Sequence, residues 1–396
     1  MMRLKDTRYQ NTASFLNSAI AIAEYFGFIP FEEAARRDLA QIREIRRRAR
    51  GSEREISFAR KEERVLAVAA RRLSILAHAP PESLLLWRVG SDAKAAMPTA
   101  SLELHIIGTQ SAIAEALLIV IANAIAREAG LPERVLSINN IGSPESSGRF
   151  VRDVASFLRK HIESISVTLR PRAATDPLGA LVALIERGHP AIPRSPQAME
   201  YLTEEERRRF WELLEYIEAL GLSYELSPTV LGSRDCWAHT LFQISVIDAA
   251  SGSRIPVAFG GRYDPLASRF AAAALPAVMI SITCELRGKT RVKREHPLPP
   301  SIYFAHLGAE ARRRALPILE NLREAGIPVS HGLYHERIGE QMAAARRLAS
   351  PYILIMGHKE AVEGTILVRE AATNSQDAIP LQELTGYLKR RRFVSA

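Results

Sequence analysis

The order of the strand and helix patterns changes once along this chain of 396 residues, and that change limits the possible folds most strongly. Between residues 84 and 283, strand-like runs come in pairs framed by helical patterns, which predicts an antiparallel sheet packed against helices. After residue 300 strands and helices alternate, which predicts a small α/β domain with a largely parallel sheet. We therefore predict an α+β domain followed by an α/β domain.

A charged segment separates the two patterns. Residues 287–300 read RGKTRVKREHPLPP, end in prolines and show no apolar periodicity, as is typical of a linker. We place the first domain at residues 1–288, the linker at 289–300 and the second domain at 301–396. The length of the chain suits two domains.

Hydrophobic periodicity predicts the individual elements of the first domain. Helices are expected at 11–26, 32–50, 62–77, 112–129, 147–163, 177–187 and 203–220. Strands are expected at 84–89 and 102–108, separated by a polar loop at 90–101, and in a hairpin formed by 240–247 and 254–259.

Charge and cysteine usage narrow the class of protein. The net charge of +9 favours a polyanionic partner such as RNA, although arginine clusters such as residues 43–50 equally fit the solvated face of a helix. The chain has no apolar run of roughly 18 residues and its amino terminus is polar, so we expect a cytoplasmic protein without a membrane span. Cys236 and Cys284 lack metal-site spacing, and we expect neither a disulfide nor a zinc ion.

The most specific string is GGRYD at residues 260–264, between a predicted strand and a predicted helix. Its two glycines would let the backbone approach a ligand, and Arg262 and Asp264 could bind or order polar groups. A turn with a surface salt bridge is the alternative interpretation.

The neighbours of this string resemble histidyl-tRNA synthetases. Asp235 and the run Thr240-Leu-Phe-Gln precede GGRYD, and PAVMISITCELR at 276–287 follows it, in the order of that family's histidine-pocket motif, GGRYD and class II motif 3. Blocks that match family segments extend the resemblance to both ends of the chain: 27–33, 60–62, 103–105, 137–142, 176–178, 322–329, 338–345, 352–360 and 364–369. It implies a class II catalytic core, an anticodon-binding domain, ATP with magnesium, tRNA and a homodimer.

The resemblance also implies roles for particular residues. Glu103 and Glu285 stand where class II enzymes hold adenylate or magnesium, and with Lys94 they are the predicted catalytic residues. No metal is expected to be held by the protein alone. The predicted substrate-binding residues are Glu62, His105, Asp235, Arg262, Tyr263 and Asp264. Buried salt bridges are the competing explanation for these polar residues, and a hydrogen-bonded structural role is the competing explanation for His105.

Several positions depart from the family pattern. Three arginine sites are filled by Lys94, Gly232 and Leu286, none of which offers the planar fork that clamps phosphate. Ile106 and Gln110 replace a glutamine and a glutamate that hold substrate histidine. The arginines that could substitute from adjacent positions are Arg88, Arg234 and Arg287.

These departures leave three hypotheses. The first is a synthetase paralogue, in effect a pseudoenzyme, that has lost or weakened aminoacylation and keeps a tRNA-binding or regulatory role. The second is an active but divergent histidine–tRNA ligase that uses the adjacent arginines. The third is a regulatory subunit of ATP phosphoribosyltransferase, although such proteins generally lack the carboxy-terminal domain and keep the histidine pocket.

Overall fold

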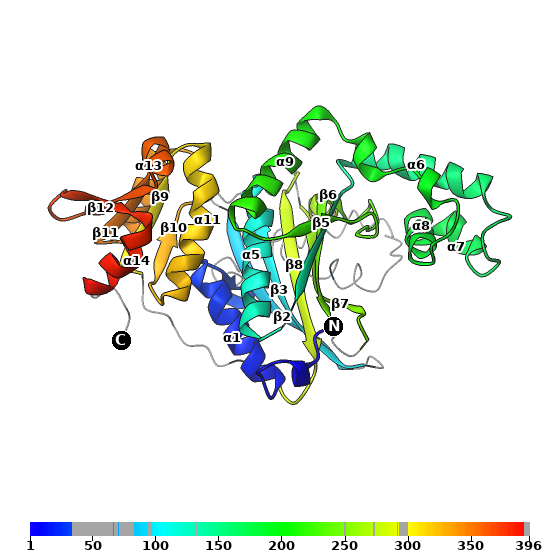
Figure 1. Cartoon of the computed structure of the whole chain (residues 1–396), viewed down its shortest axis with the longest axis horizontal. Helices are drawn as coiled ribbons and strands as arrows, with labels where there is room; N and C mark the ends of the chain where they lie inside the picture. The colour runs from blue at the N-terminus through cyan, green and yellow to red at the C-terminus, as the bar shows by residue number, and fades with distance from the viewer. Residues whose placement is uncertain are drawn as a thin grey trace.

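Two sheets organise the chain, and they lie in separate parts of the molecule (Figure 1). The computed structural model describes residues 1–33, 83–93, 97–131, 133–248, 251–271, 274–290 and 300–391, together with Leu66, Ala70 and Val292. Strands of the first sheet end at Glu285, and those of the second begin at Ile302. None of the helices in these ranges is long and apolar enough to span a bilayer.

The first sheet has eight strands and is antiparallel apart from its two short edge strands, β1 and β5. Its strands, in spatial order, are β1 (Ile29–Pro30), β2 (Leu84–Asp92), β3 (Thr99–Ile107), β8 (Ala277–Glu285), β7 (Arg254–Arg262), β6 (Ala238–Ile247), β4 (Arg134–Asn140) and β5 (Tyr224–Leu226). The predicted antiparallel sheet is therefore confirmed.

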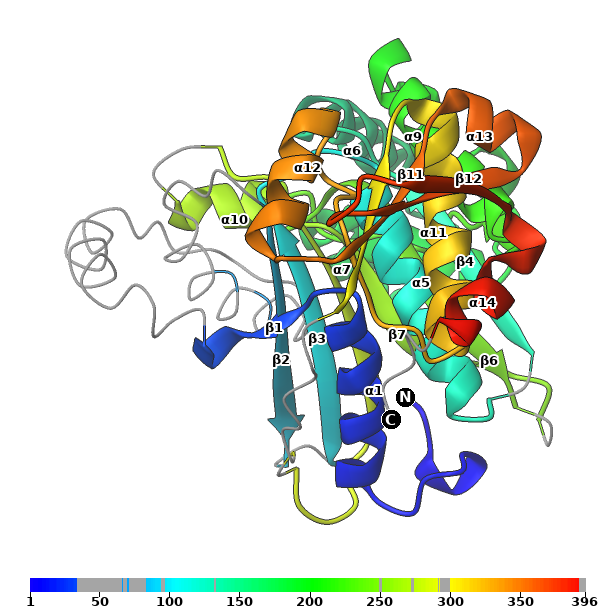
Figure 2. The ribbon, with the colours of Figure 1, turned by 90° about the vertical axis from the view of Figure 1, so that its left-hand side faces the viewer.

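Helices cover one face of this sheet. Figure 2 shows α1 (Thr12–Tyr25) and α5 (Ile113–Glu128) lying along it, and α9 (Glu204–Ala219) packs against α5. Residues 113–122 of α5 are all buried, as expected for a helix that is apolar on every side and is enclosed by sheet and helices. A helical insert extends from one end of the sheet, and α10 (Asp264–Phe270) follows β7. The insert contains α6 (Pro144–Lys160), α7 (Arg170–Thr175) and α8 (Pro177–Glu186).

The carboxy-terminal domain contains a five-stranded sheet in the order β10-β9-β11-β12-β13. Its elements are β9 (Ile302–His306), α11 (Ala309–Glu324), β10 (Val329–His331), α12 (Ile338–Arg347), β11 (Tyr352–Met356), α13 (His358–Glu363), β12 (Thr365–Glu370), β13 (Gln376–Pro380) and α14 (Leu381–Arg390). The prediction of a largely parallel sheet was wrong, because β12 and β13 pair antiparallel. No hydrophobic pattern predicted β13, whose residues are mostly exposed and lack alternation.

The first hairpin also differs from its prediction. Residues 90–92 and 99–101, assigned to a polar loop, extend β2 and β3, and Gly90 pairs with Ser101. Backbone pairing needs no apolar side chain, so hydrophobicity alone placed the strand ends too early. The helices predicted at 32–50 and 62–77 lie almost wholly outside the described residues.

The carboxy-terminal domain docks on the core through α1 and α5. The Tyr25 hydroxyl donates to the carbonyl oxygen of Ile327 at 2.9 Å, and Nη1 of Arg323 contacts Oε1 of Glu128 at 2.6 Å. Close to Tyr25, Nε2 of His331 lies 3.1 Å from the carbonyl oxygen of Phe26. These contacts fix the second domain beside the helix-covered face of the first sheet (Figure 2).

Candidate functional site

The sheet face opposite α1 and α5 carries most of the polar side chains that the sequence singled out. The even-numbered residues of β3 from 100 to 106 are buried in the core that contains both helices. Side chains alternate along a strand, so Glu103 and His105 lie on the opposite face. In register with Glu103 are Arg88 of β2 and Ser281 of β8.

Four polar side chains, from β2, β3 and the residue that follows β7, form a row on this face, which we call the Glu103 row. Nε and Nη2 of Arg88 donate to Oε2 of Glu103 at 2.9 and 2.5 Å. Nε2 of His105 lies 3.8 Å from the same oxygen, and Nδ1 of His105 lies 3.0 Å from the hydroxyl of Tyr263. Since the Arg88 side chain is 15% exposed and Tyr263 is fully buried, the row runs from the solvent edge into the core.

The charges in the row follow from burial and contact. Burial would raise the pKa of Glu103, but the neighbouring His105 and Arg88 outweigh it, and this pKa is lowered. Burial lowers the pKa of His105 and raises that of Tyr263. Near neutral pH, Glu103 is therefore an anion beside a neutral imidazole. Nε2 of His105 is buried and has no hydrogen-bond partner in the described part of the chain.

Glu285 lies in a separate cluster at the other end of the same strands. It stands opposite Thr99, four residues along β3 from Glu103, or about 13 Å at roughly 3.3 Å per residue. Its Oε1 accepts from the backbone N–H of Leu4 at 2.7 Å and pairs with Nε of Arg287 at 2.8 Å. Magnesium binds oxygen ligands at about 2.1 Å, so Glu103 and Glu285 do not converge on one ion in this arrangement.

Arg262 of the GGRYD string is held in a buried network of charges. It is 1% exposed, and its Nε contacts Oδ2 of Asp264 at 2.9 Å, while its Nη1 contacts Oε2 of Glu115 at 3.3 Å. Burial opposes its charge, but Asp264 and Glu115 raise the pKa of Arg262 overall. Glu115 is fully buried and also pairs with Arg209. The string therefore ties together β7, α5, α9 and α10, as the salt-bridge interpretation expected.

The two glycines of the string approach neighbouring strands. A Cβ atom on Gly260 would lie within 2.9 Å of the carbonyl oxygen of Met279 and the ring of Phe242. A Cβ atom on Gly261 would lie 2.7 Å from the carbonyl oxygen of Thr240. Close packing between strands therefore accounts for both glycines without a ligand.

Trp237 fills the space next to Gly232. A Cβ atom on Gly232 would lie within 3.0 Å of three atoms of the Trp237 ring. That ring is 3% exposed and packs edge-to-face on Phe259, with ring centroids 5.4 Å apart. A larger side chain at position 232 therefore requires the indole to move. The position at which the resemblance expects an arginine is closed.

Two charged side chains of the 232–239 segment lie at the surface of the molecule. Asp235 pairs with Arg269 of α10 at 3.0 Å, and the exposed Arg234 places Nη1 beside Gly148 of α6. His239 has a φ of 52°, a backbone conformation that favours glycine. Burial lowers the pKa of His239, and the Arg209 charge lowers it further.

Lys94 and Glu62 lie outside the described residues, so their predicted roles stay predictions. Sequence reasoning missed Glu115, Arg209 and Trp237. Glu115 had a usable signal, since it is the only charged residue between 113 and 126 in an otherwise apolar helix. No group of three or more His, Cys, Asp or Glu residues within the described ranges is arranged to hold a metal ion.

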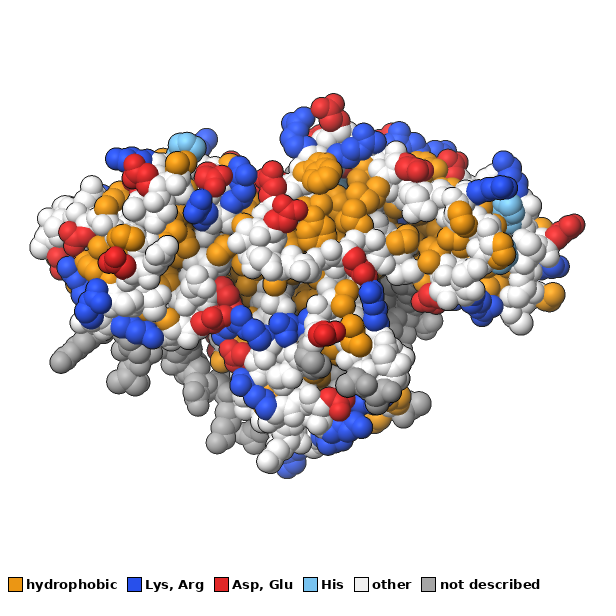
Figure 3. Space-filling model, in the orientation of Figure 1, with side chains coloured by type: hydrophobic (Ala, Val, Ile, Leu, Met, Phe, Trp, Pro, Cys, Tyr) orange, Lys and Arg blue, Asp and Glu red, His pale blue; other side chains and the backbone are white. Residues whose placement is uncertain are grey.

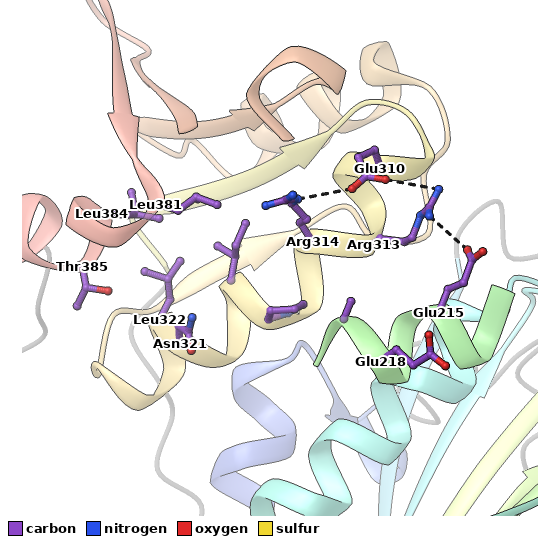
Figure 4. Close-up of a pocket in the computed structure, with 13 residues that line it drawn as sticks. Glu215, Glu218, Glu310, Arg313, Arg314, Asn321, Leu322, Leu381, Leu384 and Thr385 are labelled. Carbon is purple, nitrogen blue, oxygen red and sulfur yellow. Dashed lines mark ion pairs between the residues drawn. The ribbon is translucent and has the colours of Figure 1, made fainter. Parts of the chain in front are cut away.

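A cavity of about 520 Å³ lies between α9, α11 and α14, where the two domains meet (Figure 4). Its charged side chains pair with one another. Arg313 lies 3.5 Å from both Glu215 and Glu310, and Arg314 lies 3.6 Å from Glu310. This cavity contains none of the predicted site residues.

An antiparallel sheet with one face covered by helices, a polar row on the other face and a separate α/β domain define the class II aminoacyl-tRNA synthetase fold. Residues 301–391 match the family model described as an anticodon binding domain. The chain is 28% identical over 298 residues to a histidine–tRNA ligase of Thermosynechococcus vestitus, which covers 74% of this chain and 69% of that protein. It is 29% identical over 287 residues to the histidine–tRNA ligase of Bacillus subtilis, which covers 72% and 68%.

Among solved structures, the histidyl-tRNA synthetase of Staphylococcus aureus without ligand aligns with a TM-score of 0.45 at 20% identity, covering 81% of each chain. A protein of Bacillus halodurans, titled an ATP phosphoribosyltransferase regulatory subunit/histidyl-tRNA synthetase, aligns with a TM-score of 0.41 at 16% identity, covering 87% of this chain and 93% of that one. The sequence relatives and the carboxy-terminal domain support a protein of the histidyl-tRNA synthetase family, similar to histidine–tRNA ligases over about three quarters of this chain.

Proposed function

We propose that this protein has lost or weakened the adenylation of histidine and acts as an RNA-binding or regulatory member of its family. The observation that carries the proposal is the closed position at Gly232, where the Trp237 ring occupies the space an arginine would need. A guanidinium that binds two oxygens at once is hard to replace, because its fork sets both charge and geometry.

Two further observations support the proposal. Arg262 and Asp264 are committed to the buried network around Glu115, so they have little freedom to bind a substrate. Asp235 is exposed and paired with Arg269, which also limits its freedom to bind a substrate. An enzyme site instead holds its binding groups aimed at one place.

The test is histidine-dependent exchange of pyrophosphate into ATP by the purified protein. We expect exchange at the level of a blank without enzyme. The histidine–tRNA ligase of Bacillus subtilis serves as the positive control. Robust exchange by the unmodified chain contradicts the proposal.

The RNA-binding part of the proposal rests on the net charge of +9 and on the match of residues 301–391 to an anticodon binding domain. Binding that uses phosphate contacts weakens linearly on a log–log plot against salt concentration. We expect this dependence when the chain is titrated with tRNA. If tRNA fails to bind even at low salt, the domain is serving another purpose.

An active divergent ligase is the second candidate, and one observation favours it. Arg88 and Arg287 each lie beside a predicted catalytic carboxylate, at 2.5 and 2.8 Å, and could present guanidinium groups to a nucleotide. Arg88 binds Glu103 through Nε and Nη2, so its Nη1 remains as a donor for the nucleotide when ATP and magnesium bind. If exchange is seen, Arg88→Met and Arg287→Met should abolish it, whereas the distant surface variant Arg347→Met should not.

A regulatory subunit of ATP phosphoribosyltransferase is the remaining alternative. Co-purification of the chain with a short phosphoribosyltransferase would favour it. The match of residues 301–391 to an anticodon binding domain argues against this alternative, because such subunits generally lack that domain. We further propose that the protein is a cytoplasmic homodimer, which sedimentation and fractionation would test.

A further inference from the structure

A cavity of about 250 Å³ lies between the helical insert and the sheet edge formed by β4 and β5, and we call it the insert cavity. It is distinct from the Glu103 row, which lies on β2, β3 and the residue that follows β7. Figure 3 shows hydrophobic side chains gathered on the surface between α9 and α6, in this part of the fold. The insert cavity is lined by Asn139, Phe150, Leu181, Ile185, Ser195, Pro196, Gln197, Ala198, Met199, Leu226, Ser227, Pro228 and Leu231.

The walls of the insert cavity are uncharged and largely apolar. None of its lining residues is an acid or a base, and Phe150, Leu181 and Leu231 are each no more than 2% exposed. A charged ligand would lose its hydration here without gaining a partner, which is costly. The chemistry of the walls therefore selects a neutral ligand.

Asn139 supplies a directional polar group within this apolar surface. It is 5% exposed, and its Oδ1 accepts from the backbone N–H of Asn140 at 2.9 Å. Its side-chain nitrogen is not among the buried polar atoms that lack a partner in the described part of the chain, so this N–H keeps access to the solvent of the cavity. It can therefore donate to an acceptor on a molecule that enters the cavity. The hydroxyl of Ser195, which accepts from Nε2 of Gln197 at 3.4 Å, is a second polar group in the lining of the cavity.

The volume limits the size of the ligand. Sites for complete small-molecule ligands usually enclose about 300 to 1,000 Å³, so the insert cavity suits a single ring system and excludes a whole nucleotide. Nucleobases combine an apolar planar face with acceptors on their edges, and proteins hold unpaired bases by stacking and edge hydrogen bonds. We propose that the insert cavity binds a neutral nucleobase, with the side-chain N–H of Asn139 donating to an acceptor on the base edge. The base comes either from a free nucleoside or from an unpaired nucleotide of an RNA.

The experiment is a titration of the full chain with adenosine, guanosine, cytidine and uridine, followed by saturation-transfer NMR. A parallel titration uses single-stranded oligonucleotides to separate the two sources of the base. We expect at least one nucleobase to bind saturably. Asn139→Leu, which keeps the size of the side chain and removes its donor, should weaken binding about tenfold. Ala198→Phe, which fills the cavity, should abolish it.

The control variant Val167→Phe adds the same ring to the insert at a position that is 73% exposed and does not line the cavity. It should bind like the unmodified chain, and unchanged melting temperatures should show that all variants fold. Binding to oligonucleotides but not to nucleosides assigns the site to RNA. The proposal is overturned if no nucleobase binds in either form, or if Ala198→Phe binds normally. Pyrophosphate exchange is independent of these outcomes, so the two proposals can fail separately.

Discussion

Lowering the pH from 7.5 to 5 should destabilise the carboxy-terminal domain, because it contains two buried imidazoles, one of which contacts the core. His331 contacts the carbonyl oxygen of Phe26 through Nε2, and His306 packs against the backbone of Gly332 and Leu333. Nδ1 of His331 and Nε2 of His306 have no hydrogen-bond partner in the described part of the chain. Within the described ranges, no carboxylate contributes to the pKa of either ring, so nothing there stabilises its charged form.

The magnitude follows from the pKa values. Burial lowers the pKa of His306 from 6.5 to about 4, assisted by the Arg312 charge, and burial lowers that of His331 from 6.5 to about 4. A group whose pKa falls on folding takes up its proton more readily when the structure opens. Its contribution to stability is therefore complete above pH 6.5 and is lost as the pH falls toward 4. At pH 5 the loss is about 2 kcal/mol for each histidine, or about 4 kcal/mol for the pair.

Urea unfolding at pH 7.5 and at pH 5 measures this loss. The double variant His306→Asn/His331→Gln keeps neutral hydrogen-bonding groups at both positions and removes the titration. Its stability should fall by about 4 kcal/mol less than that of the unmodified chain between the two pH values. His358→Gln, an exposed change in the same domain, should behave like the unmodified chain. If the double variant and the unmodified chain lose equal stability, the reasoning is refuted.

Three further changes have calculable outcomes in urea unfolding at neutral pH unless stated. Glu103→Gln leaves Arg88 without its charged partner and should lower the free energy of unfolding by about 3 kcal/mol. Glu204→Gln, which removes an exposed pair, should change this free energy little. Equal effects of the two variants would argue against a stabilising buried pair. The pKa of Glu206 is lowered to about 2, because hydrogen bonds from residues 143, 146 and 203 outweigh its burial. Its contribution to the free energy of unfolding should therefore be lost as the pH falls from 4.5 to 2. Glu206→Gln should cost about 2 kcal/mol at neutral pH and flatten this pH dependence. Gly260→Ala should cost about 3 kcal/mol or prevent folding, and a soluble variant of normal stability would refute the close strand packing inferred there.

The fold was largely predictable because its long elements have strong periodic patterns. Residues 112–129 were expected to form a helix, and α5 spans Ile113–Glu128. The edge strand β13 was missed because its exposed residues carry no hydrophobic signal. The extension of β2 and β3 was missed because the backbone hydrogen bonds that define strand ends are independent of side-chain polarity.

The candidate site was less predictable, because a motif identifies residues without showing what each one contacts. The sequence left GGRYD open between a binding site and a turn with a salt bridge, because Glu115, which binds Arg262, lies 147 positions earlier in the chain. Glu103 and Glu285 looked equivalent in sequence, yet the strand register separates them. The pairing of Arg88 with Glu103 depends on a different register, that of β2 with β3, which the predicted loop at 90–101 had obscured.

The packing of Trp237 against Gly232 also restricts how this chain can evolve. Restoring an arginine at position 232 in one step would drive the new side chain into a buried indole and destabilise the protein. Shrinking Trp237 first would leave a cavity beside Phe259 and cost about 3 kcal/mol or more before any benefit appeared. The two positions are therefore epistatic, and reversion to the family's arginine requires passing through a less stable intermediate whichever residue changes first.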